Sequence, residues 1–196
     1  MENINIILAS SSPRRKELLK KIGLSFDIKK SGINEHSKIK LKSHLFAEYW
    51  AEKKAKDISK SNKKSLIIGA DTIVVIDGSI LGKPTNNQEG INMLKNLSGN
   101  MHEVVTGVSL QYKKLNISDT FHSKTKIFFN KIDEESIKEY LKNEKPFDKA
   151  GSYGIQDSIA KYIKRIEGCY YNVVGLPISE FYKRYKIILK VIQEKT

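Results

Sequence analysis

The N-terminal segment passes from a buried strand into a helix through a short polar connection. Residues 4–9 form an apolar run, which is typical of a strand buried in a sheet. Three serines follow, and Ser12 with Pro13 fits a helix start, with serine as the N-cap and proline in the first turn. Apolar residues then recur at helical spacing. This stretch therefore predicts a strand and a helix that meet at a serine-rich connection.

That connection has the residue types of an anion site. The free N–H groups and the dipole of a helix start attract anions, and guanidinium groups suit phosphate oxygens. We therefore expect Ser10, Ser12, Arg14 and Arg15 to bind phosphate. The alternative is an ordinary capped helix whose two arginines are solvated.

Helical and extended segments alternate along the rest of the chain. We expect helices over residues 44–58 and about 179–193, and two more that begin at Thr85, in a capping-box pattern with Gln88, and at Asp133. Strands are expected over residues 65–70, 73–76, 104–112 and 120–129, with a hairpin turn at Asp77-Gly78. The pattern predicts an α/β fold, a mixed twisted sheet with flanking helices, as one domain over residues 1–196.

The charge balance favours anionic partners. The formal net charge is +13, from 35 basic and 22 acidic residues. Only four of the basic residues are arginines, and the lysines are scattered through nearly every segment. We therefore consider nucleic acid an improbable partner and give more weight to the two arginines of the serine-rich connection.

Cysteine content and hydropathy predict a cytoplasmic protein. Cys169 is the single cysteine and cannot form an internal disulfide, which fits a reducing compartment. No run approaches the ~20 apolar residues of a membrane span, and the N-terminus does not have the pattern of a signal peptide. We expect no membrane partner.

Two acidic residues are candidates for a metal site. Asp71 ends a buried run, which is where α/β sheets usually place their functional groups, and Glu35 lies in a loop that could reach it. Carboxylate oxygens suit Mg²⁺ or Mn²⁺, which bridge to substrate phosphates. The alternatives are a turn aspartate that bonds backbone N–H groups and a solvated loop acid.

Basic and polar residues elsewhere could complete such a site. Lys54 and Lys83 could each neutralise phosphate charge, although a single lysine in this chain is usually just solvated. Tyr153 and Gln156 flank a glycine and could present an aromatic face and an amide to a base, and a glutamine amide suits a pyrimidine edge. The alternative is a glycine turn with packed side chains. For His102 we expect a structural or positioning part.

Several motifs are absent, and each absence excludes a class. The chain has no Gly-x-x-x-x-Gly-Lys-Ser/Thr loop, no Gly-x-Gly-x-x-Gly fingerprint, no paired-cysteine zinc spacing and no Gly-x-Ser-x-Gly elbow. This argues against P-loop, Rossmann, zinc-finger and α/β-hydrolase proteins.

Taken together, these stretches resemble the Maf family of nucleotide pyrophosphatases. The resemblance runs in one order through Leu8-Ala9-Ser10, Ser12-Pro13-Arg14-Arg15, Gly69-Ala70-Asp71-Thr72, Gly82-Lys83-Pro84, Ser98-Gly99 with His102, Thr106-Gly107-Val108, Lys149-Ala150-Gly151-Ser152-Tyr153-Gly154-Ile155-Gln156 and Asn172-Val173-Val174-Gly175-Leu176-Pro177. Each piece is weak alone, but their common order is highly specific.

The resemblance implies a fold like that of the inosine-triphosphate pyrophosphatases, with two lobes around a cleft. It also implies cleavage of a nucleoside triphosphate to the monophosphate and pyrophosphate with a divalent metal. Asp71 matches the catalytic carboxylate, which would bind metal or activate water, while Glu35, Lys54 and Lys83 would hold metal or phosphate. A homodimer and a link to septum formation are compatible with the family.

Within the family, three residues resemble the branch that acts on dTTP and UTP. These residues are Arg14, Thr72 and Gln156, whereas a sister branch that acts on 7-methyl-GTP has an aromatic residue and a glutamate at or near two of these positions. The alternatives are 7-methyl-GTP as substrate, or a basic protein that binds nucleic acid or a division partner and keeps a vestigial nucleotide site.

The chain departs from the family pattern at three places. Asn34 and Lys53 stand where the family often has acids, just before Glu35 and Lys54. After Gln156, the usual small, glycine-rich stretch is replaced by Asp157-Ser158-Ile159-Ala160. The last departure concerns the shape of the base pocket more than the chemistry.

Overall fold

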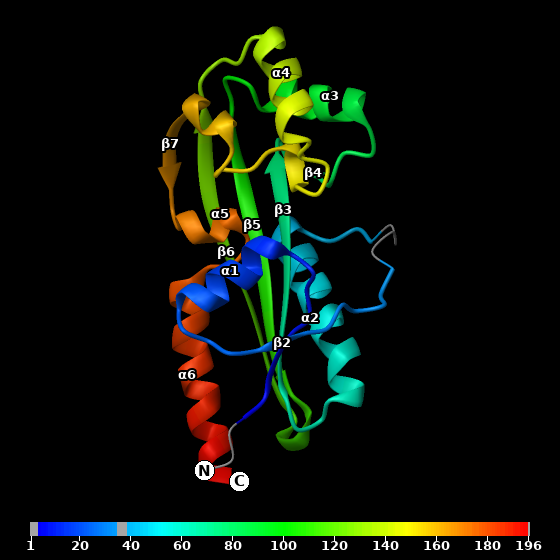
Figure 1. Ribbon diagram of the computed structural model, residues 1–196, viewed down its shortest axis with the longest axis vertical. Coiled ribbons are helices and arrows are strands. Elements are labelled where there is room, and N and C mark those ends of the chain that lie inside the picture. The colour runs from blue at the N-terminus through cyan, green and yellow to red at the C-terminus, as the bar shows by residue number, and fades with distance from the viewer. Residues whose placement is uncertain (1–3, 35–38, 196) are drawn as a thin grey trace.

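A mixed sheet of seven strands organises the molecule in the computed structural model, which describes residues 4–34 and 39–195 (Figure 1). The strand order is β2-β1-β3-β5-β6-β7, and β4 pairs with β3 off this path. β1 runs parallel to β2 and β3, and the other pairs are antiparallel. The strands are β1 Ile6–Leu8, β2 Asp27–Ile28, β3 Leu66–Ile76, β4 Ser79–Leu81, β5 Met101–Tyr112, β6 Ile117–Phe129 and β7 Ile163–Glu167.

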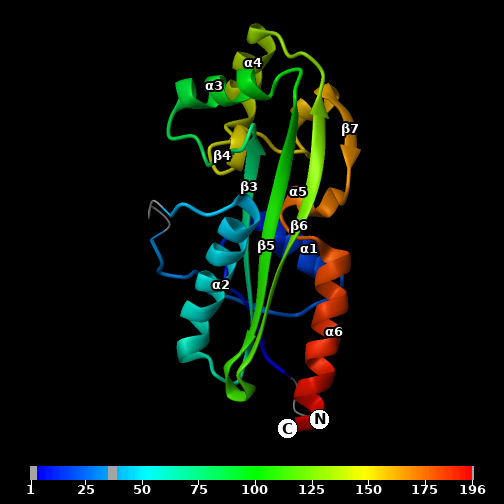
Figure 2. The ribbon, with the colours of Figure 1, turned by 180° about the vertical axis from the view of Figure 1, so that it is seen from behind.

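Helices cover both faces of this sheet and one end of it. In Figures 1 and 2, α2 lies on one face, α1 and α6 lie on the other, and α3 and α4 gather at one end of the long axis. The expected mixed sheet with flanking helices is therefore confirmed. The α-helices are α1 Pro13–Lys21, α2 Ser43–Ser61, α3 Asn87–Leu97, α4 Glu134–Glu144, α5 Tyr170–Val174 and α6 Ile178–Lys195, and the short 3₁₀ segments are η1 Lys113–Leu115, η2 Ala150–Ser152 and η3 Ser158–Tyr162.

Alternation along β3 assigns its side chains to two different cores. Ile67, Ile73 and Val75 face α2, in two small apolar clusters with residues of that helix. The even-numbered apolar residues of β3 belong to the large core that includes α1 and α6. Successive side chains of a strand point to opposite faces. Asp71 therefore turns toward α2, and Thr72 turns toward the face that α1 covers.

Two glycines let α2 lie directly on the sheet. A Cβ atom on Gly69 of β3 would lie 2.2 Å from the carbonyl oxygen of Ala51, and one on Gly107 of β5 would lie 2.3 Å from the carbonyl of Ala47. The helix backbone therefore occupies the space that side chains at these positions would need. This close approach sets the height of α2 above β3.

Part of the outer edge of β3 is not covered by a strand in the described chain. β1 pairs with β3 up to Ile68, and β4 pairs with it only from Val74 onward. The backbone N–H of Leu66 donates to Asn5 O, and Ile68 O accepts from the backbone N–H of Ala9. The even-numbered residues of β3 therefore turn their backbone N–H and C=O groups toward this edge. Ala70 and Thr72 continue that series beyond the end of β1.

Local signals at turns and caps are mostly as the sequence predicts. Asp77 and Gly78 have φ values of 48° and 75°, as a two-residue hairpin turn requires, and Asp133 caps α4. The expected N-cap at Thr85 is wrong by one residue. Asn86 caps α3 because its side chain accepts from the backbone N–H of Glu89, while Thr85 donates to the Glu89 carboxylate.

No helix in the described part of the chain combines the length and the apolar character needed to cross a membrane.

Candidate active site

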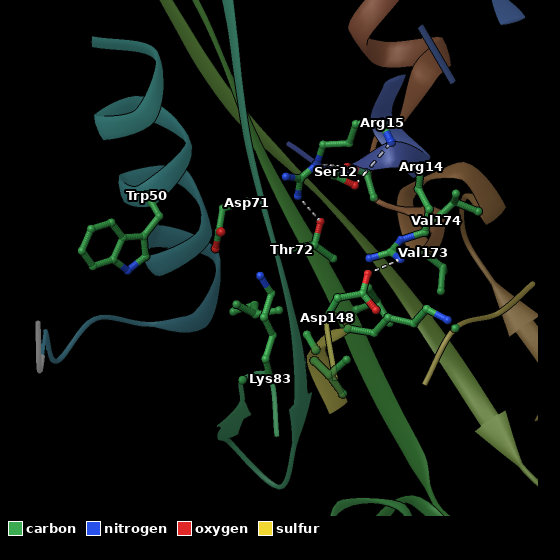
Figure 3. A pocket seen from close by; sticks show the side chains of 18 of the residues that line it. Ser12, Arg14, Arg15, Trp50, Asp71, Thr72, Lys83, Asp148, Val173 and Val174 are labelled. Atoms are coloured by element: carbon green, nitrogen blue, oxygen red, sulfur yellow. Dashed lines mark hydrogen bonds and ion pairs between the residues drawn. The ribbon is translucent and has the colours of Figure 1, made fainter. Parts of the chain in front are cut away.

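A cavity of about 680 Å³ lies beside the uncovered edge of β3 (Figure 3). Its walls come from the start of α1 and from α2 on one side, and from residues 148–157 on the other, with the segment after β4 between them. Binding pockets for small molecules usually have volumes of ~300–1,000 Å³. The cavity corresponds to the cleft that the sequence predicts and is large enough for a nucleotide.

A buried ion pair forms part of the wall nearest to α2. The Nζ atom of Lys54 lies 2.7 Å from Oδ1 of Asp71, and both residues are only 8% exposed. The pair forms because α2 lies close to the odd-numbered face of β3. Among the described residues, Lys54 is the hydrogen-bond partner of this carboxylate, so Oδ2 is left for a ligand. The sequence predicts Lys54 only as a partner of phosphate or metal, so its pairing with Asp71 is a finding of the structure.

The donors near Asp71 fit a divalent cation together with phosphate. Mg²⁺ is usually held by one or two carboxylates, waters and substrate phosphates, rather than by a full protein cage. Asp71 supplies one carboxylate oxygen at the cavity wall, and Glu35 lies outside the described residues. No group of three or more His, Cys, Asp or Glu side chains that could hold a metal occurs within residues 4–34 and 39–195. This donor set therefore requires a ligand such as phosphate to complete a metal site.

Lys83 extends into the same part of the cavity from the segment after β4. Its side chain is exposed and lines the cavity, and Figure 3 shows it pointing toward Asp71. Its position places an exposed positive charge opposite the buried pair.

Arg15 is held by nearby Ser10 and by protein groups from two distant segments. Its Nε donates to Gly175 O at 2.9 Å, Nη1 donates to Ser10 Oγ at 3.1 Å, and Nη2 donates to Thr72 Oγ1 at 2.9 Å. Arg15 is 8% exposed, and Ser10 is not among the described residues that line the cavity. Ser12 does line it and caps α1 as predicted. Ser10 therefore orients Arg15 from behind the cavity wall.

Arg14 bridges the two sides of the cavity. Its Nη1 lies 2.8 Å from Oδ2 of Asp148, which belongs to the opposite wall (Figure 3). Burial raises the pKa of Asp148, but the hydrogen bond and charge of Arg14 outweigh it, so that the pKa lies below its usual value. The guanidinium predicted to hold phosphate is thus paired with the carboxylate of Asp148.

The sequence matches the family description Maf-like protein over residues 5–186. The chain belongs to the Maf family. The resemblance seen in the sequence motifs is therefore confirmed, and the match includes all the segments that form the cavity.

Curated relatives share nearly half of their residues with this Maf protein. A dTTP/UTP pyrophosphatase of Bacillus pumilus is 46% identical over 175 residues, which cover 89% of this chain and 92% of the relative. One of Ruminiclostridium cellulolyticum, with the same name, is 48% identical over 176 residues, covering 89% and 91% of the two chains. Among solved structures, the Ham1 protein of Staphylococcus aureus overlaps 64% of this chain and 71% of its own, with a TM-score of 0.47 and 16% identity.

The Thr72 hydroxyl of this Maf protein has a fixed orientation. Thr106 Oγ1 donates its proton to Asn172 O at 2.9 Å, so the 3.0 Å contact between Thr72 and Thr106 must use the proton of Thr72. Thr72 Oγ1 also accepts from Arg15. A hydroxyl oxygen has two lone pairs and one proton. Toward the cavity, Thr72 can therefore accept one more hydrogen bond but cannot donate one.

Gln156 and Tyr153 differ in exposure although both line the cavity. Gln156 is exposed, as a residue that reads a ligand must be, whereas Tyr153 is buried between the rings of His102 and Phe129. The hydroxyl of Tyr153 lies 2.6 Å from Nε2 of His102. Burial lowers the pKa of His102 to about 4, so this histidine is neutral near pH 7. Its contacts agree with the structural or positioning part expected for it.

Sequence reasoning gave no part to Trp50 and Asp148, which line the cavity, and it named Lys149 and Asp157 only within the family motif and its departure. Asp148 has no local signal, because its partner lies 134 residues away in the chain. Lys149 opens the motif that ends at Gln156, and Asp157 follows it, so their position could have indicated them.

Proposed function

We propose that this Maf protein hydrolyses dTTP and UTP to the nucleoside monophosphate and pyrophosphate. The main support for this proposal is the Asp71 carboxylate, which Lys54 holds at the wall of a nucleotide-sized cavity. Arg14 and Lys83 line the same cavity. The names of the relatives at 46% and 48% identity support the same reaction.

In this proposal, the triphosphate lies between the start of α1 and Lys83. The first turn of α1 offers few backbone donors, because Pro13 has no N–H and the N–H groups of Ser12 and Arg15 donate to Ser10 Oγ and Ser12 Oγ. The side chains of Arg14 and Lys83 therefore offset most of the negative charge of the phosphates, with Ser12 beside them. Arg15 contributes a fixed positive charge, because its three donor nitrogens are already oriented by Gly175, Ser10 and Thr72. The same charges stabilise the pyrophosphate as it leaves.

Asp71 and Glu35 would hold Mg²⁺ or Mn²⁺ in this reaction. When bound, such an ion lowers the pKa of a coordinated water and polarises phosphoryl oxygens. Water adds to the α-phosphorus, the bond from that phosphorus to the bridging oxygen breaks, and pyrophosphate leaves. Asp71 serves either by holding the ion or by taking a proton from water. Both roles use its carboxylate, which Nζ of Lys54 contacts at 2.7 Å.

The base would be selected by Thr72 and Gln156. Uracil and thymine present an N3–H donor between two carbonyl oxygens, whereas N3 of cytosine is an acceptor. Thr72 offers an acceptor only, and the Gln156 amide offers one acceptor and two donor hydrogens. This set of groups complements uracil and thymine better than cytosine, which supports dTTP and UTP as substrates.

The first test is pyrophosphate release from dTTP, UTP, CTP, GTP and 7-methyl-GTP with Mg²⁺ or Mn²⁺. We expect strong turnover of dTTP and UTP alone. Turnover of 7-methyl-GTP instead would contradict the base assignment. A folded protein that is inactive on the whole panel would overturn the proposed reaction and favour a binding protein with a vestigial site.

Replacing Asp71 by asparagine tests the catalytic assignment. We expect Asp71→Asn to lower kcat by at least ~100-fold while nucleotide still binds, because an amide can neither take a proton nor hold a cation well. Pyrophosphate release and calorimetric binding measure the two properties. Asp77→Asn is a matched control, because Asp77 ends the same strand in a turn where asparagine is equally suited. Retention of most activity in Asp71→Asn would contradict the assignment.

The homodimer and the cytoplasmic location stay predictions. We propose both on the family resemblance and on the cysteine content alone, and light scattering of the purified protein tests the first.

A further inference from the structure

Gln156 lies in a tight turn that returns on itself. The backbone N–H of Asp157 donates to Gly154 O at 3.0 Å, so residues 154–157 form one closed turn. All four residues line the cavity. The orientation of the Gln156 amide therefore depends on what holds this turn.

The Asp157 carboxylate holds the turn from behind. Asp157 precedes η3 at the N-cap position but makes no side-chain cap bond there. Its Oδ2 instead accepts hydrogen bonds from the hydroxyl of Tyr140, at 2.7 Å, and from Nζ of Lys149. The side chains of Lys149 and Asp157 are only 14% and 13% exposed, so this ion pair is largely shielded from solvent.

Tyr140 connects both ends of the same turn. Its hydroxyl donates to Asp157 and accepts from the backbone N–H of Gly154 at 3.2 Å. Burial, and then the hydrogen bond to Asp157, raise the pKa of Tyr140, so the hydroxyl keeps its proton. Gly154 has no room for a side chain, since a Cβ atom would lie 2.6 Å from Oδ2 of Asp157. The carboxylate, the hydroxyl and the turn are thus packed as one unit.

We propose that Asp157 is a positioning residue for pyrimidine selection. Through Tyr140 and Lys149 it fixes the turn that carries Gln156, and it neutralises Lys149, which also lines the cavity. This inference rests on the proposed function and adds to it the residue that orients the base-reading amide.

A fixed turn matters because the amide of glutamine can face a base in two ways. Rotated by half a turn, it exchanges its donor and acceptor and would suit cytosine as well as uracil. A turn held at three points favours one orientation of the backbone from which the amide extends. Asp71 and Lys83 lie on other segments, so loosening the turn should affect base selection more than the chemical step.

The test compares Asp157→Asn and Tyr140→Phe with the wild type on UTP and CTP. We expect KM for UTP to rise about tenfold and the preference for UTP over CTP, in kcat/KM, to fall about tenfold, with kcat changed less than about threefold. In Tyr140→Phe, inhibition by inorganic tripolyphosphate should be unchanged, because this probe has no base and the variant keeps the ion pair of Asp157 with Lys149. Tyr140→Phe removes a single oxygen atom and keeps the ring that packs in the core.

Tyr162→Phe is the matched control, because the hydroxyl of Tyr162 donates to Ser136 on α4 rather than to the turn. This variant should have the wild-type kcat and KM for both UTP and CTP. Wild-type selectivity in Asp157→Asn and Tyr140→Phe would overturn the inference, and so would a loss of kcat with KM unchanged. If the inference fails in this way while the wild-type protein still hydrolyses UTP, the proposed function remains intact. A wild type that hydrolyses neither UTP nor dTTP overturns both.

Discussion

At the scale of single residues, the burial of His102 makes the stability of the fold depend on pH. Burial lowers its pKa to about 4, whereas an unfolded chain has a histidine pKa near 6.5. Below pH ~6.5 the unfolded chain therefore binds a proton that the folded protein does not bind. The contribution to stability is complete above that pH and is lost as the pH falls toward 4.

We therefore predict that His102→Gln flattens the pH dependence of unfolding. Between pH 6.5 and 4.5, the free energy of unfolding of the wild type should fall more steeply, by at most about 1.4 kcal/mol per pH unit. Urea unfolding at several pH values measures both slopes. Carboxylates titrate in this range in both proteins, so their effect cancels in the difference. Parallel curves would show that His102 does not carry this dependence.

Arg15 shows which part of a site local sequence can predict. The capped helix start and the arginines beside it are local features, and the structure has them where the sequence predicts. The partners of Arg15 are not local, since Gly175 and Thr72 lie 160 and 57 residues away. Spacing within one segment carries no information on such contacts. The sequence could therefore propose a phosphate-binding arginine but could not show that its donors are held by the protein.

At the scale of elements, the close packing of α2 on the sheet places Lys54 beside Asp71 in the candidate active site. Lys54 reaches Asp71 because Gly69 and Gly107 allow the helix backbone to approach the sheet. The packing of one helix therefore determines whether the Asp71 carboxylate has its cationic partner.

We predict that Gly107→Ala lowers the free energy of unfolding by about 3 kcal/mol, because the new Cβ atom would lie within 2.3 Å of the Ala47 backbone and would displace α2. Urea unfolding measures the change. Gly32→Ala is the control and should stay within about 0.5 kcal/mol of the wild type, since nothing lies within 4 Å of a Cβ atom there. Equal stability of both variants would contradict the tight seating of α2.

β3 shows why a functional strand was divided in the sequence interpretation. The sequence predicts an apolar run over residues 65–70 that ends at Asp71-Thr72, with residues 73–76 continuing extended, and the structure has Leu66–Ile76 as one strand. The polar pair Asp71 and Thr72 interrupts the apolar pattern because both side chains line the cavity. Local patterns are most misleading where function replaces packing residues. The strands of the long hairpin were predicted without an interruption, but each begins three residues earlier than expected, at Met101 and at Ile117.

At the scale of the whole molecule, three strands join its two ends. Figures 1 and 2 show β3, β5 and β6 running along the long axis, from the end that carries α3 and α4 toward the end that carries much of α2 and α6. Apolar residues of all three strands belong to the large core on one face of the sheet. We propose on this basis that residues 1–196 form one domain.

A single domain should unfold in one step. The protein has one tryptophan, Trp50 on α2, whose fluorescence reports on the cavity wall, while far-UV circular dichroism reports on all helices. We predict that urea unfolding curves from the two signals coincide, as two-state unfolding requires. Two separated transitions would show that the end with α3 and α4 unfolds on its own.

The uncovered edge of β3 has a consequence for how proteins with this architecture diversify. Backbone N–H and C=O groups of Ala70 and Thr72 face that edge, between the end of β1 and the start of β4. Every residue type except proline has the same two groups, so a substitution at either position keeps these main-chain donors and acceptors. The hydrogen-bonding capacity of this edge is therefore inherited with the strand itself, whereas the chemistry of the cavity depends on side chains such as Asp71, Lys54 and Arg14, which a substitution removes.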